Sequence, residues 1–215
     1  MTMTCELDHL VLGAHTLAQG ATFVEALLGV KPQPGGAHAA MGTHNLVLRL
    51  GAHAYLEVIA IDPAATAPAR PRWFGLDAET TRRRLRDSPC LLTWAARTQD
   101  IDTAARGGPL SLGTIHSMSR GAYAWRITIP DDGALIGDGL IPAVIQWDGD
   151  THPVEQLGQC GCELVTLEGM HPAPGSIAPA LAALGLERTL APVRADHARL
   201  VAAIRCPLGI RTISS

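Results

Sequence analysis

The stretch LDHLVLGAHTLAQGATFVEALLG, residues 7–29, predicts a strand followed directly by a helix. Its first part, residues 7–12, is a short and mostly apolar run of the length that buried strands have. Thr16 is followed three residues later by Gln19, and this spacing resembles the capping box that opens a helix. Gly29 supplies a residue that readily adopts the left-handed conformation at which helices commonly end.

The predicted helix has one apolar face. Apolar side chains recur at the spacing that places them on one side of a helix, at Leu17, Ala21, Val24 and Leu28. A helix of this kind packs its apolar face against a neighbouring element to form a core. We therefore expect Leu17, Val24 and Leu28 to be buried against the first sheet.

Three more strands are expected after this helix, and they complete a βαβββ unit over residues 6–62. A turn rich in proline and glycine comes first, and the strands follow as HAAMG at residues 38–42, HNLVLRL at 44–50 and AYLEVIAI at 54–61. The short Gly-containing connection at residues 51–53 predicts a hairpin between the last two strands.

The same order of elements returns twice further along the chain. Residues 63–89 are rich in proline, alanine and arginine, and a peripheral linker with one short helix at residues 78–86 fits them better than a core element. A second unit is expected over residues 90–147, and a third over residues 163–214, with Pro179 in the first turn of its helix. We expect a single α+β domain over residues 1–215, in which repeated βαβββ modules form cup-shaped mixed β-sheets with the helices outside.

The composition excludes several classes of protein. The chain has 215 residues, of which 47% are hydrophobic and 17% charged, as is typical of globular proteins. No stretch approaches the roughly 20 apolar residues of a membrane helix, and the first residues lack the basic character of a signal peptide, so we expect a cytoplasmic protein. The net charge is -3, and the one basic run lacks interleaved aromatic residues, which indicates a solvated helix surface rather than a nucleic-acid interface. That run consists of Arg82, Arg83, Arg84 and Arg86.

The cysteines do not predict a disulfide framework. Their number is odd and they are scattered along the chain, at Cys5, Cys90, Cys160, Cys162 and Cys206, so reduced thiols are expected. The closely spaced Cys160 and Cys162 could hold a soft metal ion together with His152 or His171. No second cysteine pair completes a tetrahedral set, however, and packing in a turn is the favoured interpretation.

Several short motifs carry information beyond the order of elements. In the first unit they are Asp8-His9-Leu10-Val11, Gly42-Thr43-His44-Asn45 and Tyr55-Leu56-Glu57, and near the end of the second unit they are Ile141-Pro142, Ile145-Gln146-Trp147-Asp148 and His152-Pro153. Together they resemble the glyoxalase-like domain family of the vicinal-oxygen-chelate superfamily, which also includes bleomycin resistance proteins and extradiol dioxygenases. The resemblance covers nearly the whole chain. It implies a cup in which two modules pair and line a cavity for a small molecule.

The resemblance also implies a divalent metal ion, with ligands on the first and last strands of a module. These positions hold His9 and Glu57 here, and an imidazole with a carboxylate suits zinc, iron, nickel or manganese. The matching positions of the second unit hold Thr93 and Ala143, which are not convincing ligands. Since two protein ligands hold a transition metal poorly, a further donor is required. The candidates are His44, His116, Gln146 and Glu168.

His9 and Glu57 also permit an interpretation without a metal. His9 can be hydrogen-bonded within the sheet, and Glu57 can be paired with an arginine such as Arg49 or with backbone N–H groups. A buried, ionised glutamate without such a partner would cost several kcal/mol. In either case we expect the two side chains to lie in one cavity on adjacent strands, close enough for one metal ion or one water molecule to bridge them.

The resemblance implies a protein that binds a small organic molecule in the cup. As an enzyme it would carry out metal-dependent lyase, isomerase or dioxygenase chemistry with Glu57 as a catalytic residue, and the alternative is a binding or sequestering protein without chemistry. The residues expected to contact the ligand are His44, Asn45, Tyr55, His116, Gln146 and Trp147. The third unit lacks a partner unit, so we expect it either to pack against the linker or to form a homodimer interface.

Overall fold

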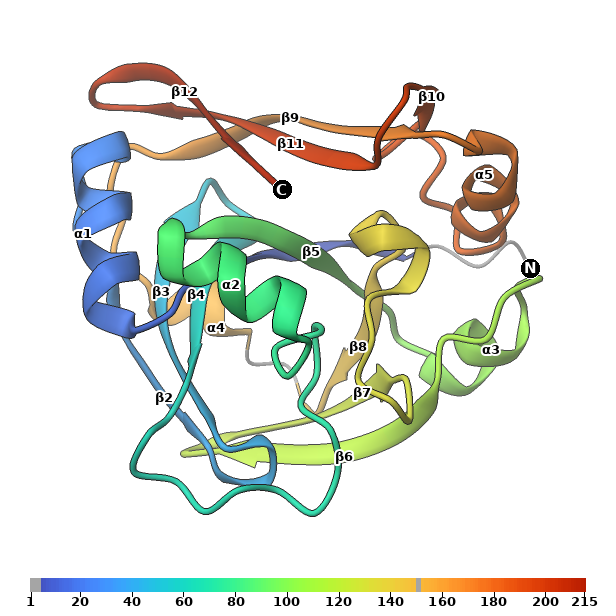
Figure 1. Ribbon diagram of the computed structural model, residues 1–215, viewed down its shortest axis with the longest axis horizontal. Helices are drawn as coiled ribbons and strands as arrows, with labels where there is room; N and C mark the ends of the chain where they lie inside the picture. Colours follow the sequence, from blue (N-terminus) through green and yellow to red (C-terminus); the bar gives the residue numbers. More distant parts are fainter. Residues whose placement is uncertain (1–4, 150–151) are drawn as a thin grey trace.

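Strand β1 lies near the middle of an eight-stranded sheet with the strand order β2-β3-β4-β1-β5-β8-β7-β6 (Figure 1). The computed structural model describes residues 5–149 and 152–215. The strands of this sheet are β1 (Glu6–Gly13), β2 (Gln33–His38), β3 (Thr43–Leu50), β4 (Ala54–Ile61), β5 (Cys90–Arg97), β6 (Thr114–Arg120), β7 (Tyr123–Ile129) and β8 (Ala143–Trp147). The helices are α1 (Leu17–Leu28), α2 (Glu79–Asp87), α3 (Ile101–Arg106), α4 (Pro153–Gln156) and α5 (Pro174–Ala183), with short 3₁₀ turns at Ala39–Met41 and Ile136–Gly139.

The eight-stranded sheet consists of two halves with the same topology. In the first half β1 is parallel to β4, and in the second β5 is parallel to β8. The halves join where β1 and β5 run antiparallel to each other. The mixed α+β architecture with a curled sheet is therefore the one that the sequence predicts.

Helix α1 begins and ends as its sequence indicates. The Thr16 hydroxyl accepts a hydrogen bond from the Gln19 N–H, the Gln19 side chain accepts one from the His15 N–H, and Gly29 has the left-handed φ of 72°. Val24 and Leu28 are fully buried, as predicted. Leu17 is only partly buried, because it opens the helix at the edge of the sheet.

The predicted strand at residues 38–42 is wrong. The proline- and glycine-rich segment before it forms β2, which pairs with β3, and Ala39–Met41 is a 3₁₀ turn. Strand β2 is mostly exposed and lies at an edge of the sheet, where proline is tolerated. Because the strand ends at residue 38 instead of beginning there, His38 lies at the end of β2 and next to β3.

The third unit repeats the order of elements but not the pairing of strands. Its four-stranded sheet has the order β10-β9-β11-β12, and β9 lies between a parallel β10 and an antiparallel β11. The strands are β9 (Glu163–His171), β10 (Val193–Arg194), β11 (Arg199–Cys206) and β12 (Gly209–Ser214). The stretch ERTLAPV at residues 187–193 is typical of a strand by its sequence, but only its last residue belongs to one, the two-residue β10. Pro179 lies inside α5 and not in its first turn, because the helix already begins at Pro174.

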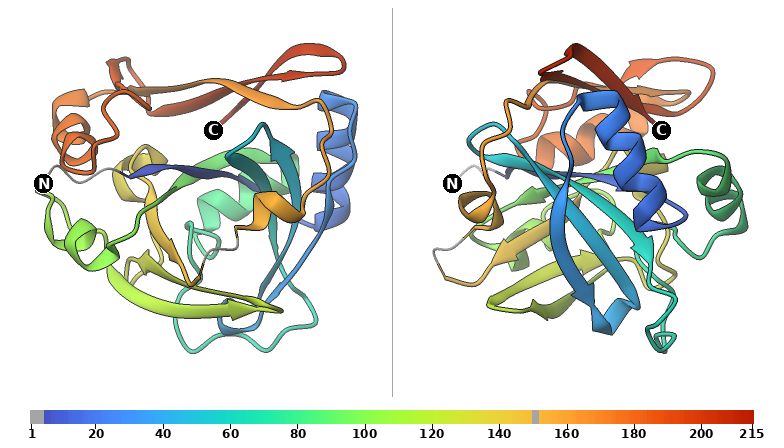
Figure 2. Two further views of the ribbon diagram at one scale, coloured as in Figure 1. Left: turned by 180° about the vertical axis from the view of Figure 1, so that it is seen from behind. Right: turned by 90° about the vertical axis from the view of Figure 1, so that its left-hand side faces the viewer.

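The four-stranded sheet packs against the first two units within the same chain (Figure 2). Side chains from β9, β11 and β12, such as Leu167, Ile204 and Ile213, share one core with Leu10 of β1 and Trp94 of β5. Among the described residues, the buried side chains of the linker belong to a different core, so packing of the third unit against the linker, one of the two expected arrangements, is not the arrangement observed. The other arrangement, a homodimer, stays a prediction.

The linker contributes to the core instead of only connecting two units. Trp73, Phe74, Leu76 and Leu85 are buried in a second core on the other face of the eight-stranded sheet, together with Val11 and other inward-facing side chains of the cup. The expectation of a peripheral linker is therefore corrected: its aromatic residues fill the hollow of the sheet. None of the helices among the described residues is long and apolar enough to cross a membrane.

The buried face of α1 yields a stability prediction. Val24→Asp would place a charge without a partner in the core between α1 and the sheet, and we expect a loss of several kcal/mol in the free energy of unfolding. Thr22→Asp on the exposed side of the same helix serves as the control and should change the stability by less than about 0.5 kcal/mol. Urea denaturation measures both; equal midpoints for the two variants would show that the buried face is assigned wrongly.

Candidate functional site

An irregularity in β1 brings Asp8 and His9 to the same side of the sheet. Successive side chains of a regular strand point to opposite faces. The register of β1 against β5 shifts between Leu7 and His9, so Asp8 is an extra residue in the strand. Such a β-bulge redirects the side chain of the inserted residue. As a result, the Asp8 carboxylate contacts the His9 imidazole, with 2.6 Å between Oδ1 and Nδ1.

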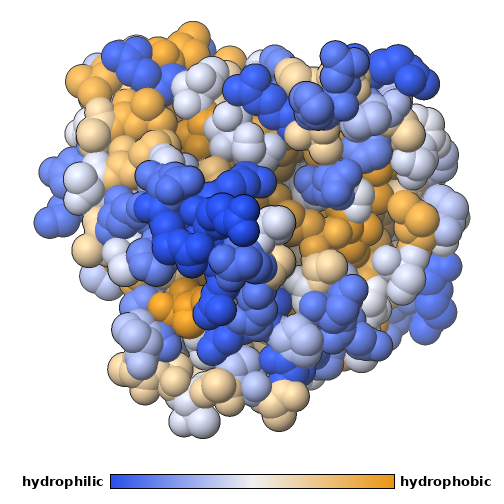
Figure 3. Space-filling view, viewed as in Figure 1, coloured by the Kyte–Doolittle hydropathy of each residue, from blue (hydrophilic) through white to orange (hydrophobic). Residues whose placement is uncertain are grey.

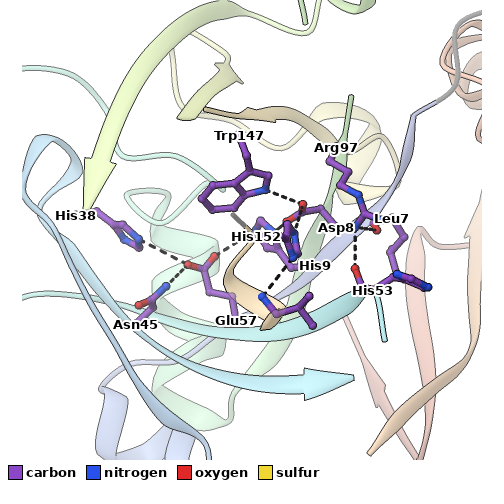
Figure 4. A network of polar contacts seen from close by, with 11 residues as sticks. Leu7, Asp8, His9, His38, Asn45, His53, Glu57, Arg97, Trp147 and His152 are labelled. Atoms are coloured by element: carbon purple, nitrogen blue, oxygen red, sulfur yellow. Dashed lines mark hydrogen bonds and ion pairs between the residues drawn. The ribbon is translucent and has the colours of Figure 1, made fainter. Parts of the chain in front are cut away.

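Asp8 is a fully buried carboxylate that three side chains satisfy (Figure 4). Besides His9, the Trp147 indole N–H donates to Oδ2 at 2.9 Å, and His152 Nε2 also lies 2.9 Å from Oδ2. Burial opposes the charged form, but the hydrogen bonds and charges of His152 and His9 outweigh it and hold the pKa of Asp8 well below its usual range. Asp8 is therefore an anion, and a carboxylate in that state only accepts hydrogen bonds.

The position of Asp8 determines which nitrogen of each histidine carries a proton. His152 caps α4, and its Nδ1 accepts a hydrogen bond from the Val154 N–H, so its Nε2–H donates to Asp8. His9 donates its Nδ1–H to the same carboxylate. The remaining nitrogen of His9, Nε2, is thus left to face the interior of the cup.

Glu57 lies opposite that nitrogen. Its Oε2 is 3.7 Å from His9 Nε2, across the parallel strands β1 and β4. The expected proximity of the two side chains is therefore observed. Stacking of the Tyr55 ring on His9, with the centroids 4.7 Å apart, fixes the imidazole from its other side.

Asn45 holds the other oxygen of Glu57. Its Nδ2–H donates to Oε1 at 2.5 Å, while its own Oδ1 is buried without a hydrogen-bond partner among the described residues. Gly35 on β2 leaves room for this amide, since any side chain at that position would collide with it. The expected partner Arg49 instead donates to the carbonyl oxygens of Gly51 and Leu157.

A second histidine completes this cluster, and the sequence analysis did not identify it. The Nε2 of His38 is 3.9 Å from Glu57 Oε1 and accepts a hydrogen bond from Arg120 at 3.0 Å, while its Nδ1 contacts the Thr43 hydroxyl. Burial lowers the pKa of His38 to about 4, against the effect of the negative charge of Glu57. His38 is therefore neutral near pH 7.

These polar groups surround a small recess inside the cup. Its volume is about 20 Å³, which is room for one water molecule. The apolar walls are Trp73, Phe74, Trp125, Ile127, Ile145 and Trp147. Two of them come from the linker: Trp73 and Phe74 stack on each other with centroids 5.1 Å apart. Phe74 has a φ of 58°, a conformation that is strained for a bulky residue.

The donor set of the recess does not fit a resident metal ion. Two donors, His9 Nε2 and Glu57, face each other, but the nearest third nitrogen, His38 Nε2, already accepts from the Arg120 guanidinium. That positive charge would repel a divalent cation. In the part of the chain that the structure describes, no three His, Cys, Asp or Glu side chains are grouped so that they could hold a metal ion. Thr93 donates to the Gly139 carbonyl oxygen and supplies no ligand to the recess.

The structure brings only some of the expected ligand-contacting residues together. Asn45, Tyr55 and Trp147 lie in the cluster around Asp8 and Glu57. The side chains of His44, His116 and Gln146 do not line the recess. His44 and Gln146 lie on the other face of the sheet in the observed register, whereas His116 shares a face with Ile127 but lies on the edge strand β6.

Each of these three residues has other contacts. His44 lies 3.9 Å from Asp62, His116 contacts Arg70, and Gln146 accepts hydrogen bonds from the Ile101 N–H and from Arg126. Glu168, a further candidate metal ligand, is exposed on the four-stranded sheet, where the Thr166 hydroxyl donates to it.

Comparisons with known proteins agree with this architecture. The model of a family described as glyoxalase-like domain matches residues 7–185. A hypothetical protein from Staphylococcus aureus is 12% identical over 91% of this chain and 88% of its own, with a TM-score of 0.63. Methylmalonyl-CoA epimerase from Mycobacterium tuberculosis is 16% identical over 70% of this chain and 93% of its own, with a TM-score of 0.43. A variant of the Streptomyces coelicolor epimerase in complex with 2-nitronate-propionyl-CoA has the same identity and TM-score, over 70% of this chain and 99% of its own. No curated protein matches the chain by sequence.

The low pKa of His38 predicts how the stability depends on pH. The unfolded chain takes up a proton at this residue near its ordinary pKa of 6.5, and the folded protein only near 4. The contribution of His38 to the free energy of unfolding is therefore fully present above pH 6.5. It is lost as the pH falls toward 4, at up to about 1.4 kcal/mol per pH unit. Burial also lowers the pKa of His116 and acts in the same direction, so a comparison of variants is needed to isolate His38.

Urea denaturation between pH 4.5 and 7.5 tests this prediction with His38→Phe, which removes the titrating group and keeps an aromatic ring. We expect a shallower decline in the free energy of unfolding for His38→Phe than for the wild type. His197→Phe, at an exposed position, serves as the control and should decline like the wild type. Parallel plots of the free energy of unfolding against pH for the wild type and His38→Phe would contradict the low pKa of His38.

Proposed function

Because the chain belongs to the glyoxalase-like domain family, we propose that it binds a small organic carbonyl compound in the cup and moves a proton on the carbon beside that carbonyl. The observation that carries the proposal is the arrangement of His9, whose Nδ1–H is held by Asp8 while its Nε2 faces Glu57 at 3.7 Å. An imidazole oriented by a carboxylate is a common general base, since its free nitrogen keeps a lone pair aimed at the substrate.

The proposed roles follow from the contacts of each group. His9 Nε2 takes the proton from carbon, and Glu57 accepts a hydrogen bond from the resulting imidazolium and stabilises its charge. Arg120 lines the same recess, and its guanidinium supplies a positive charge for the enolate oxygen that forms. Proton return to either face of the carbon gives isomerisation, and loss of a neighbouring group gives a lyase reaction.

Entry of the substrate requires a movement of the linker. The recess has a volume of about 20 Å³, far below the ~300 Å³ of small ligand sites. Trp73 and Phe74 are the walls that belong to a connecting segment rather than to the sheet. The indole N–H of Trp73 is buried without a hydrogen-bond partner among the described residues, and Phe74 is strained, so displacement of this pair breaks no side-chain hydrogen bond of the indole and relieves strain. We propose that a ligand replaces these two rings.

The alternative function is binding or sequestering without chemistry. The same recess and the same aromatic walls support it, since an apolar pocket with a few polar groups is the usual form of a ligand site. A paired histidine and carboxylate favour the enzyme, because a binding protein has no need for an oriented base. A proton-exchange assay separates the two functions.

The assay measures exchange of carbon-bound hydrogen for deuterium in D₂O by proton NMR. The substrates are a panel of 2-oxo acids, hydroxyketones and acyl thioesters. We expect accelerated exchange with one class, and His9→Ala and Glu57→Gln should each lower the rate by roughly 100-fold or more. His197→Ala and Glu168→Gln are matched controls at exposed positions and should exchange like the wild type. Ligand binding without any exchange would establish the alternative.

The donor set also predicts the metal content. Protein purified without nickel resin should contain well below one equivalent of zinc, iron, nickel or manganese. The reason is that the third potential ligand, His38 Nε2, already accepts a hydrogen bond from Arg120. Elemental analysis of the wild type and His9→Ala provides the measurement. One equivalent of metal in the wild type that disappears in His9→Ala would contradict the prediction and restore the metal site that the resemblance implies.

A further inference from the structure

A second cavity lies at the edge of the cup, between the first turn of α1 and helix α2. Its volume is about 540 Å³, within the ~300–1,000 Å³ range of small-molecule sites and far larger than the recess. None of the residues that line it also lines the recess. The turn at Trp73–Leu76 separates the two spaces, because Trp73 and Phe74 line the recess while Leu76 lines the second cavity.

The floor of the second cavity is apolar. It consists of Ala14 directly after β1, Leu17 at the start of α1, Ile61 at the end of β4, and Leu76 and Leu85 from the linker. Leu76 and Leu85 are buried in the core of the cup, so the floor is already formed in this structure. A floor of this kind accommodates the hydrocarbon part of a ligand.

The rim of the second cavity is basic. Arg82 and Arg86 lie one helical turn apart on α2, and His15, which precedes α1, and His44 on β3 line the same cavity. The space-filling view shows hydrophilic side chains gathered over α2 with hydrophobic surface directly beside them (Figure 3). The first turn of α1, which forms another wall, carries no acidic side chain.

The charges on this rim are only partly compensated. Arg86 pairs with Glu79 at 3.0 Å, but both side chains are about half exposed, and such pairs exchange readily for other anions. His44 lies 3.9 Å from Asp62. Arg82 forms no salt bridge with any of the described residues. The rim therefore presents a guanidinium that has no salt bridge within residues 5–149 and 152–215, above an apolar floor.

We propose that this second cavity binds an amphipathic organic anion, with its apolar body on the floor and its carboxylate or phosphate head on Arg82 and Arg86. The bidentate geometry of arginine suits both kinds of head group. The site is independent of the chemistry proposed for His9 and Glu57.

Isothermal titration calorimetry with four probes tests the proposal: octanoate, octyl phosphate, octanol and inorganic phosphate. We expect at least one of the two amphipathic anions to bind about tenfold or more tightly than octanol and than inorganic phosphate, since each of these lacks one half of the interaction. The better anion indicates whether the head group is a carboxylate or a phosphate. Octanol binding as tightly as both anions, or inorganic phosphate binding as tightly as octyl phosphate, would overturn the proposal.

Variants locate the site. Arg82→Ala and Arg86→Ala should each weaken binding of the better anion by about tenfold, and Ala18→Trp should block it by filling the cavity. Arg83→Ala is the matched control: it removes the same charge from an exposed position of α2 that does not line the cavity. An equal loss of affinity for the anion in Arg83→Ala and in Arg82→Ala would show a diffuse charge effect and overturn the proposal. Binding should persist in His9→Ala with Glu57→Gln, and loss of binding there would place the anion in the recess instead.

Discussion

A buried carboxylate is stable only when several donors surround its charge, and Asp8 meets this condition with His9, Trp147 and His152. These donors come from three parts of the fold: β1 itself, the end of β8 and the start of α4. The carboxylate thus ties the two halves of the sheet together at their junction. It also fixes the tautomer of His9, on which the geometry of the recess depends. Without the bulge in β1, Asp8 would face the other core, where the structure offers apolar neighbours.

The cup is filled by its own chain. Other folds with a curled sheet leave this space to a ligand, whereas here the linker inserts Trp73 and Phe74. Burial of two aromatic rings stabilises the empty protein, and the left-handed Phe74 reduces that gain. Trp73 and Phe74 therefore stabilise the protein less than their buried area alone suggests.

The sequence predicts the framework of this protein better than its chemistry. Hydrophobic periodicity and the capping residues Thr16 and Gly29 locate β1 and α1 correctly, and alternation along β4 places Glu57 in the cup. Strict alternation also explains the failures. It assigns Asp8 to the opposite face from His9, because a bulge inserts one residue without any glycine or proline to mark it.

Residues from distant segments were harder to identify. His38 belongs to an edge strand rich in proline and glycine, a composition typical of a turn. Arg120 reaches His38 from a strand 82 positions further along the chain. The linker is rich in proline and arginine, a composition typical of a peripheral segment. Its two aromatic residues, Trp73 and Phe74, nevertheless determine where it packs. Only tertiary structure brings these groups together.

The contact between Asp8 and His152 spans 144 positions of the sequence. During synthesis, β1 leaves the ribosome long before the residues that neutralise its buried carboxylate. The first unit alone supplies only His9 of the three donors, so the buried and fully hydrogen-bonded state of Asp8 forms only when Trp147 and His152 join the fold. Contacts between segments so far apart in the sequence slow folding, because the chain closes a long loop before they can form. The carboxylate that orients His9 therefore acquires its full set of donors only after the second unit has been synthesised.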